Sequence, residues 1–202
     1  MPAGYAAEWI IVGLGNPGQG YSRHRHNLGF MIVDSLVEEA RRSWRSNRKK
    51  SLVSEIELEN TKVLLVKPQT YMNLSGEAVT PIVAARMNQL QKLIVLHDDL
   101  DLIEGRVRIK VGGGDGGHKG VRSIADSLQF KGFVRVRLGI GRPPPGTTPE
   151  KFVLTSFGPD DAEVMRNLII KGGRALRLIL RNGVEMAQNM LHSENNLASY
   201  DS

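Results

Sequence analysis

The sequence has 202 residues, a net charge of +6 at pH 7 and no cysteine. The length predicts one domain or at most two small ones, and the lack of cysteine excludes disulfides, thiolate catalysis and cysteine-bound zinc. The 27 Lys and Arg residues against 21 Asp and Glu favour a polyanionic partner such as nucleic acid.

The first eight residues have neither the basic start nor the apolar core of a signal peptide. No apolar run approaches the ~20 residues that cross a bilayer. We therefore expect a soluble, cytoplasmic protein with no membrane association.

The N-terminal half alternates strand and helix patterns. Residues 9–12 predict a buried strand, followed by a glycine turn at 13–18 and a polar segment with two histidines. A helix is expected over 28–42, with Asn27 as its N-cap. Residues 44–50 then predict a surface loop, 52–58 and 62–67 a β-hairpin, and 74–87 a helix that starts late, near Val79, or kinks at Pro81.

The C-terminal half continues this alternation. The pattern predicts a buried strand (92–97), a short strand (106–111), a glycine-rich loop (112–120), a helix (121–128), a strand with one solvated face (133–141), an irregular stretch (143–149), an apolar patch in a loop (152–157), a long helix opening at 159–161 and a last helix (184–191). We therefore expect a single α/β domain with a twisted mixed β-sheet flanked by helices. Its core should span about residues 8–191, with frayed tails at 1–7 and 193–202.

Three histidines lie in polar segments that follow predicted strands: His26, His97 and His118. The carboxyl ends of parallel strands gather at one edge of a sheet, so these side chains should meet there. A histidine base needs a carboxylate to orient it, and Asp98 is the best-placed candidate. No serine nucleophile motif is present, which favours a base that activates water.

Amide side chains near the same edge suit a peptide-like substrate. Asn16 and Asn73 can each donate and accept hydrogen bonds, and could therefore hold a peptide group or a developing oxyanion.

Two other site types fit the sequence less well. Residues 13–18 match the G-x-G-x-x-G pattern of dinucleotide sites. Such a site needs a helix to begin at the third glycine, and Pro17 with a run of polar residues precedes the predicted helix. A metal site from His97, Asp98, Asp99 and His118 matches no common ligand spacing. We therefore expect neither a metal nor a nicotinamide cofactor.

Five ordered motifs resemble bacterial peptidyl-tRNA hydrolases. They are GLGNPG at 13–18 with Tyr21 and RHN at 25–27, YMNLSG at 71–76, HDDLD at 97–101, the glycine-rich loop at 112–120, and GIG at 139–141. The resemblance runs from about residue 9 to residue 191. It implies a monomeric α/β enzyme that uses no metal. Such an enzyme cleaves the ester between a peptide and the 3′ ribose of tRNA, which recycles tRNA from stalled or aborted translation.

The resemblance also implies roles for single residues. His26 resembles the catalytic base that activates water, and Asp98 resembles the carboxylate that orients it. Asn16 resembles the residue that senses the acylated amine and so separates peptidyl-tRNA from aminoacyl-tRNA.

Further positions resemble substrate contacts of the family. Tyr21, Tyr71 and Asn73 match residues that contact the substrate. Lys110 and Arg137 match the basic pair that holds the 5′ phosphate of tRNA. Phosphate contacts of this kind position the acceptor stem without reading its sequence.

One position departs from the family pattern. Lys119 stands where the family has a substrate-binding asparagine, and lysine can only donate hydrogen bonds. Some members of this fold have lost hydrolysis and serve as RNA-binding partners in organelle splicing. The presence of His26, Asp98, Asn16 and Asn73 favours the enzyme.

Overall fold

A computed structural model describes residues 7–47, 50–85 and 87–197 of the chain. The expected tails at 1–6 and 198–202, and part of the expected loop at 44–50, lie outside the described residues. Ala7 is buried in the core, whereas the sequence placed it in the frayed tail.

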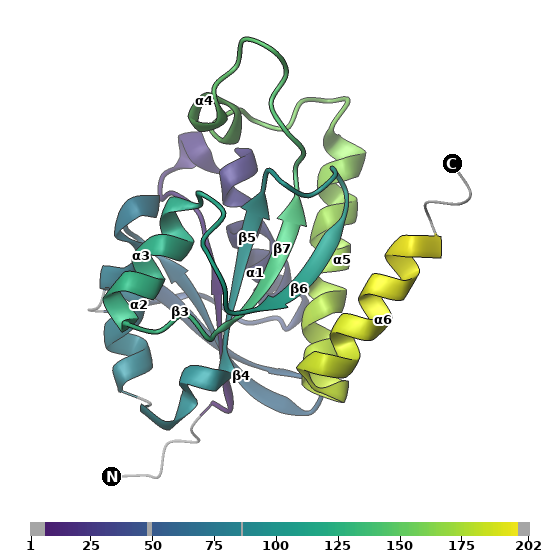
Figure 1. Cartoon of the computed structure of the whole chain (residues 1–202). Helices are drawn as coiled ribbons and strands as arrows, with labels where there is room; N and C mark the ends of the chain where they lie inside the picture. Colours follow the sequence, from purple (N-terminus) through teal and green to yellow (C-terminus); the bar gives the residue numbers. More distant parts are fainter. Residues whose placement is uncertain (1–6, 48–49, 86, 198–202) are drawn as a thin grey trace.

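The described residues form one seven-stranded mixed sheet (Figure 1). Its order is β2-β3-β4-β1-β5-β7-β6. The central strands β4, β1, β5 and β7 run parallel, whereas β2, β3 and β6 at the two edges are antiparallel to their neighbours. The strands are β1 (Trp9–Gly13), β2 (Arg45–Asn47), β3 (Ser51–Leu58), β4 (Thr61–Pro68), β5 (Leu93–Asp99), β6 (Val107–Val111) and β7 (Val134–Gly139).

Helices cover both faces of this sheet, which confirms the α/β prediction. One core layer joins the sheet to α1, α5 and α6, and the other joins it to α2 and α3. The short helix α4 lies beyond the end toward which β5 and β7 point (Figure 1). The helices are α1 (Leu28–Glu39), α2 (Ser75–Ala84), α3 (Lys119–Leu128), α4 (Pro149–Val153), α5 (Ala162–Asn182) and α6 (Val184–Leu197), and the short 3-10 helices are η1 (Gln19–Tyr21), η2 (Arg25–Asn27), η3 (Met72–Leu74) and η4 (Met87–Lys92).

Two elements of the first half differ from the prediction. The expected loop at 44–50 contains β2, which adds to the edge of the sheet by pairing with β3. Its side chains are mostly exposed, so no apolar alternation marks it as a strand. Of the two predicted forms of α2, the late start near Val79 is wrong: the helix begins at Ser75 and continues through Pro81. Proline removes one backbone hydrogen bond there, and burial of one face of α2 stabilises the helix.

Three elements of the second half also differ. The expected loop over 152–157 begins with the end of α4, where Thr148 caps the helix and Pro149 occupies its first turn. Helix α3 begins at Lys119, earlier than predicted, because the side chain of His118 caps it. Helix α6 continues to Leu197, past the predicted end at 191 and into the expected tail.

A close backbone approach fixes the start of α1 against the sheet. A Cβ atom on Gly29 would lie 2.4 Å from Leu14 N and 2.5 Å from Leu96 O, two atoms that are themselves hydrogen-bonded. A Cβ atom on Gly13 would lie 2.3 Å from Gly29 O. The two glycines therefore let α1 start directly over the ends of β1 and β5, which places η2 and its His26 at that edge.

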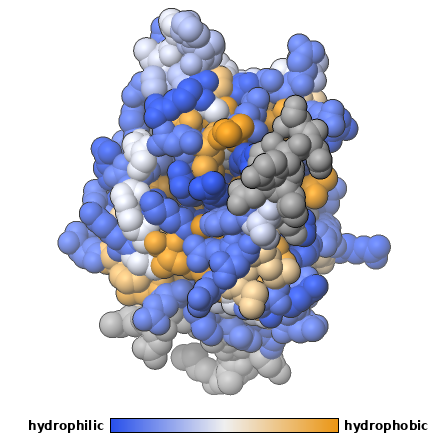
Figure 2. Space-filling view, turned by 45° about the vertical axis from the view of Figure 1, so that its right-hand side comes forward, coloured by the Kyte–Doolittle hydropathy of each residue, from blue (hydrophilic) through white to orange (hydrophobic). Residues whose placement is uncertain are grey.

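No helix in the part of the chain that the structure describes is both long and apolar enough to cross a membrane. On the face drawn in Figure 2, hydrophobic areas are separate and lie among hydrophilic ones.

We expect Gly29→Ala to lower the free energy of unfolding by at least about 2 kcal/mol, because the new methyl group would displace backbone atoms. For a chain of this length, the midpoint of thermal unfolding should fall by about 4–8 °C. Gly20→Ala is the matched control, since a Cβ atom there meets nothing within 4 Å. Equal unfolding midpoints for the two variants would contradict this account of the helix start.

Candidate active site

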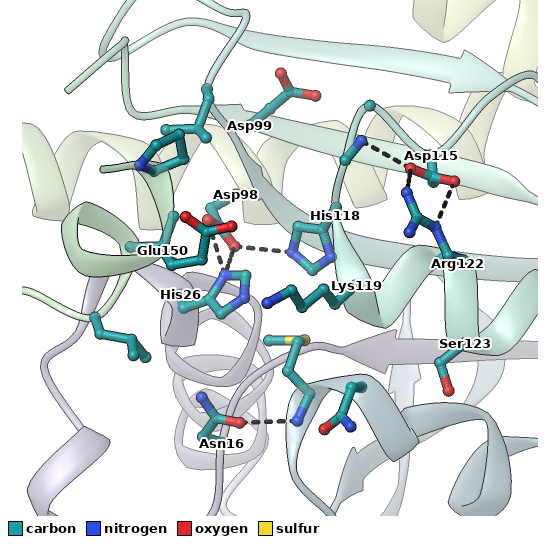
Figure 3. Close-up of a pocket in the computed structure, with 18 of the residues that line it drawn as sticks. Asn16, His26, Asp98, Asp99, Asp115, His118, Lys119, Arg122, Ser123 and Glu150 are labelled. Carbon is teal, nitrogen blue, oxygen red and sulfur yellow. Dashed lines mark hydrogen bonds and ion pairs between the residues drawn. The ribbon is translucent and has the colours of Figure 1, made fainter. Parts of the chain in front are cut away.

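A cavity of about 990 Å³ lies where the parallel strands end (Figure 3). Six separate segments contribute to its wall, as expected for loops that follow strands at one sheet edge. They are the stretch between β1 and α1 (Asn16, Tyr21, His26), the loop after β4 (Tyr71, Met72, Asn73), the end of β5 (Asp98, Asp99), the start of α3 with its preceding loop (Asp115, His118, Lys119, Arg122), the loop after β7 (Arg142), and α4 with Leu154.

One buried carboxylate joins two histidines at the bottom of this cavity. His26 Nδ1 lies 2.8 Å from Asp98 Oδ1 and 3.0 Å from Oδ2. His118 Nε2 lies 3.0 Å from Asp98 Oδ1. The Asp98 side chain is only 1% exposed. The structure thus brings together the histidine and the carboxylate that the sequence paired, and it places His118 beside them, as expected for this sheet edge.

The hydrogen bonds define which ring nitrogens carry protons. An ionised carboxylate only accepts, so His26 Nδ1 and His118 Nε2 both donate to Asp98. His118 Nδ1 accepts from the backbone N–H groups of Gly120 and Val121 at the start of α3. His118 is therefore held as a neutral Nε2–H tautomer, and the bond from His26 Nδ1 to Asp98 makes Nε2 the nitrogen of a neutral His26 ring that can serve as a base.

The imidazoles keep the carboxylate ionised. Burial alone would raise the pKa of Asp98, but its interactions with His26 and His118, including the hydrogen bonds that both rings donate, outweigh burial and hold the pKa far below its ordinary value. Burial lowers the pKa of His118, which agrees with its neutral tautomer.

Asn16 is held by its backbone and by its side-chain oxygen. Asn16 N donates to Asn27 Oδ1 at 2.9 Å, and Asn27 Nδ2 donates to Asn16 O at 3.0 Å. Asn16 Oδ1 accepts from Met72 N at 2.8 Å. These bonds leave the Asn16 amide nitrogen as the donor available at the cavity wall. Asn27 is the N-cap residue of α1, as predicted, but its side chain anchors Asn16 and forms no capping hydrogen bond.

The other expected substrate contacts divide into two groups. Tyr21, Tyr71, Asn73 and Lys119 line the cavity, and three of them are exposed whereas Tyr21 is half-buried. The expected phosphate pair lies elsewhere, on the neighbouring strands β6 and β7. There Lys110 is exposed, and Arg137 Nε donates to Asp99 Oδ2 at 2.6 Å.

Strands β6 and β7 carry a basic face that is larger than the sequence predicted. The antiparallel register places Arg108 opposite Arg137 and Lys110 opposite Arg135, so all four side chains leave the same face. The predicted solvated face of β7 is wrong at Arg135, which is 3% exposed and donates to Gly112 O and to Gly114 O at 2.7 Å. Arg135 thereby ties down the glycine-rich loop. Val111, the last residue of β6, is half exposed.

The donor atoms of His26, Asp98 and His118 lie within 4.8 Å of one another and could hold a metal ion. This set differs from the one weighed in the sequence. His97 Nδ1 donates to Asp98 O, and Asp99 pairs with Arg137. As expected, α1 does not begin at the glycine turn, because η1 and η2 separate it from Gly18.

A family model described as Peptidyl-tRNA hydrolase matches residues 10–199. The chain belongs to this family.

Proteins that match more than 90% of this chain carry the same family name. The chain is 43% identical over 194 residues to "Peptidyl-tRNA hydrolase 2" of Corynebacterium jeikeium (strain K411), covering 94% of this chain and 81% of the relative. It is 41% identical over 185 residues to "Peptidyl-tRNA hydrolase" of Mycolicibacterium smegmatis, covering 91% and 97%. A crystal structure of peptidyl-tRNA hydrolase from Acinetobacter baumannii matches with a TM-score of 0.84 at 31% identity, covering 93% of this chain and 97% of that one.

The peptidyl-tRNA hydrolase fold also buries a third histidine beside this site. His97 is 1% exposed, its ring lies 4.8 Å from the ring of His118, and its Nε2 has no hydrogen-bond partner among the described residues. Burial, followed by the nearby His118, lowers the pKa of His97 to about 3. An unfolded histidine has a pKa near 6.5.

Below pH 6.5 the unfolded chain therefore takes up a proton that the folded chain excludes, so stability is lost as the pH falls. For His97 this loss should be about 2 kcal/mol between pH 7 and pH 5. We expect His97→Gln to reduce the drop in unfolding free energy over this interval by a similar amount, measured by urea denaturation at both pH values. Equal drops in both proteins would contradict a neutral, buried His97.

Proposed function

We propose that this chain hydrolyses the ester bond between the peptide and the 3′ ribose of tRNA in peptidyl-tRNA, releasing free peptide and tRNA. Membership of the family supports this activity. The single observation that carries the mechanism is the His26–Asp98 pair, in which Nδ1 is bound to the carboxylate and Nε2 is left to act at the wall of an open cavity.

In this proposal His26 is a general base. Its Nε2 takes a proton from water, and the resulting hydroxide attacks the ester carbonyl. Asp98 stabilises the imidazolium that forms and keeps Nδ1 protonated. The proton then passes from His26 to the departing 3′ oxygen of the ribose. The products are a carboxylic acid and a free hydroxyl group, so the step is balanced without a cofactor.

Amide groups complete the site. The free Asn16 nitrogen can donate to the peptide carbonyl next to the scissile ester, or to the oxyanion. Met72 N donates to Asn16 Oδ1 and so holds the side-chain amide in place. In this proposal the Asn16 nitrogen recognises the acylated amine by donating to the carbonyl of its acyl group. Asn73, Tyr21 and Tyr71 line the same cavity and would contact the peptide and the terminal nucleotide.

The basic face on β6 and β7 would bind the acceptor stem. Lys110 is exposed, and Asp99 holds Arg137 by Nε, which leaves the outer guanidinium nitrogens for a phosphate. We place the enzyme in the cytoplasm as a monomer, where it would recycle tRNA from stalled or aborted translation.

The base assignment predicts that His26→Ala lowers kcat by at least roughly 10²-fold, the usual contribution of a positioned base. Asp98→Asn should also be severe, because an amide favours the wrong tautomer of His26. Release of an N-acetylated amino acid from charged tRNA measures both effects. Near-normal turnover of His26→Ala would refute the assignment, and an inactive wild-type protein would favour an RNA-binding role.

The phosphate assignment predicts that Lys110→Ala and Arg137→Ala raise KM with little change in kcat, since uniform binding is lost. Each variant should also flatten the salt dependence of tRNA affinity by roughly one unit in slope. Lys92→Ala is a suitable control, because this exposed lysine lies before the opposite end of β5. If both test variants kept the wild-type salt dependence of tRNA affinity, Lys110 and Arg137 would not be phosphate contacts.

The proposed base is activated by Asp98 through a hydrogen bond, without an ion. Hydrolysis should therefore continue at the same rate after exhaustive treatment with a chelator. Loss of activity on chelation, followed by recovery on adding zinc, would instead assign His26, Asp98 and His118 as ligands.

A further inference from the structure

Lys119 is a cation of the cavity wall. It is the first residue of α3, it is exposed, and it forms no ion pair with any residue that the structure describes. Most other charged groups of the wall are paired: Asp98 with two histidines, Asp99 with Arg137, Asp115 with Arg122, and Arg142 with Asp101. No neighbouring carboxylate among the described residues neutralises the positive charge of Lys119, so this charge can interact with a bound substrate.

This charge lies close to the proposed reaction centre. Lys119 directly follows His118, which is bonded to Asp98. In Figure 3 its side chain extends across the cavity in the direction of His26. The start of α3 adds the positive end of the helix dipole at the same place. Asp98 carries a negative charge at the same centre, but an ammonium group cannot contact it, because the carboxylate is buried and its oxygens accept from the two imidazoles.

Two kinds of tRNA ester differ in charge next to the scissile bond. In a peptidyl ester the α-nitrogen is part of an uncharged amide. In an aminoacyl ester the same nitrogen is a free amine, and an α-amino group with a pKa near 7.7–8.0 is mostly protonated at neutral pH. The ammonium group would stand on the carbon next to the ester carbonyl that His26 must reach.

We propose that Lys119 is a specificity-determining residue, whose ammonium group disfavours esters with a free, protonated α-amine and so favours esters with a blocked amine. The inference rests on the proposed function and deepens it. Two like charges about 6 Å apart in a partly solvated site repel enough to change a rate about five- to tenfold. The Asn16 nitrogen would donate to the acyl carbonyl that a peptidyl ester has, whereas the charge of Lys119 would repel the ammonium group of an aminoacyl ester.

Glu150 on α4 lines the same cavity and carries the opposite charge. It would attract the ammonium group that Lys119 repels. Figure 3 shows it above His26, away from the start of α3. The two residues should therefore act in opposite directions on the same substrate.

The test compares one tRNA charged in three ways: with an amino acid, with the α-hydroxy acid of the same side chain, and with the N-acetylated amino acid. The hydroxy acid matches the amino acid in size but has no charge, so the ratio of kcat/KM for hydroxyacyl-tRNA to that for aminoacyl-tRNA isolates the effect of charge. The ratio is measured for the wild-type protein and for Lys119→Met, Lys119→Arg, Glu150→Gln and the remote control Lys92→Met.

We expect the ratio to fall about five- to tenfold in Lys119→Met, to stay within twofold of the wild-type ratio in Lys119→Arg and Lys92→Met, and to rise in Glu150→Gln. An unchanged ratio in Lys119→Met, or an equal fall in Lys119→Arg, would overturn the proposal. Cleavage of the N-acetylated substrate distinguishes failure of the Lys119 role from failure of the proposed function. If the wild-type protein cleaves it while the ratio does not move, only the role of Lys119 fails. If the wild-type protein does not cleave it, the proposed function fails and the role of Lys119 fails with it.

Discussion

A buried carboxylate with two imidazole partners is the interaction on which the site depends. Asp98 is almost completely removed from water, and a buried charge is tolerated only when it is hydrogen-bonded and paired. Its partners come from η2, before α1, and from the start of α3. Three segments that are far apart in the sequence are thereby held at one point, and the need to satisfy Asp98 also orients the proposed base.

The surrounding scaffold fixes the positions of these partners through the backbone. Glycines at 13 and 29 allow α1 to begin against β1 and β5, and Asn27 ties the segment before α1 to Asn16. On the other side, His118 caps α3 while it donates to Asp98. Each imidazole is thus held through a local backbone feature as well as through the carboxylate, which limits rotation of both rings.

The strand and helix order could be predicted from the sequence, because apolar periodicity reports burial. The pairing of His26 with Asp98 could be anticipated as well, since both follow strands that end at one edge. The roles of Asn27, His118 and Arg135 could not. Asn27 has the sequence position of a helix cap and His118 that of a loop residue. Arg135 lies in an alternating strand, and only the glycine-rich loop folded over it explains its burial. These contacts join distant segments, and local patterns do not record them.

The central claim is that hydrogen bonds set the protonation of the two rings in opposite ways. Long-range ¹H–¹⁵N correlation spectra of the ¹⁵N-labelled protein near neutral pH report directly which nitrogen of each histidine carries a proton. The account predicts protonated Nδ1 and bare Nε2 in His26, and bare Nδ1 with protonated Nε2 in His118. A His26 ring with its proton on Nε2 would leave no base facing the cavity and would contradict the account.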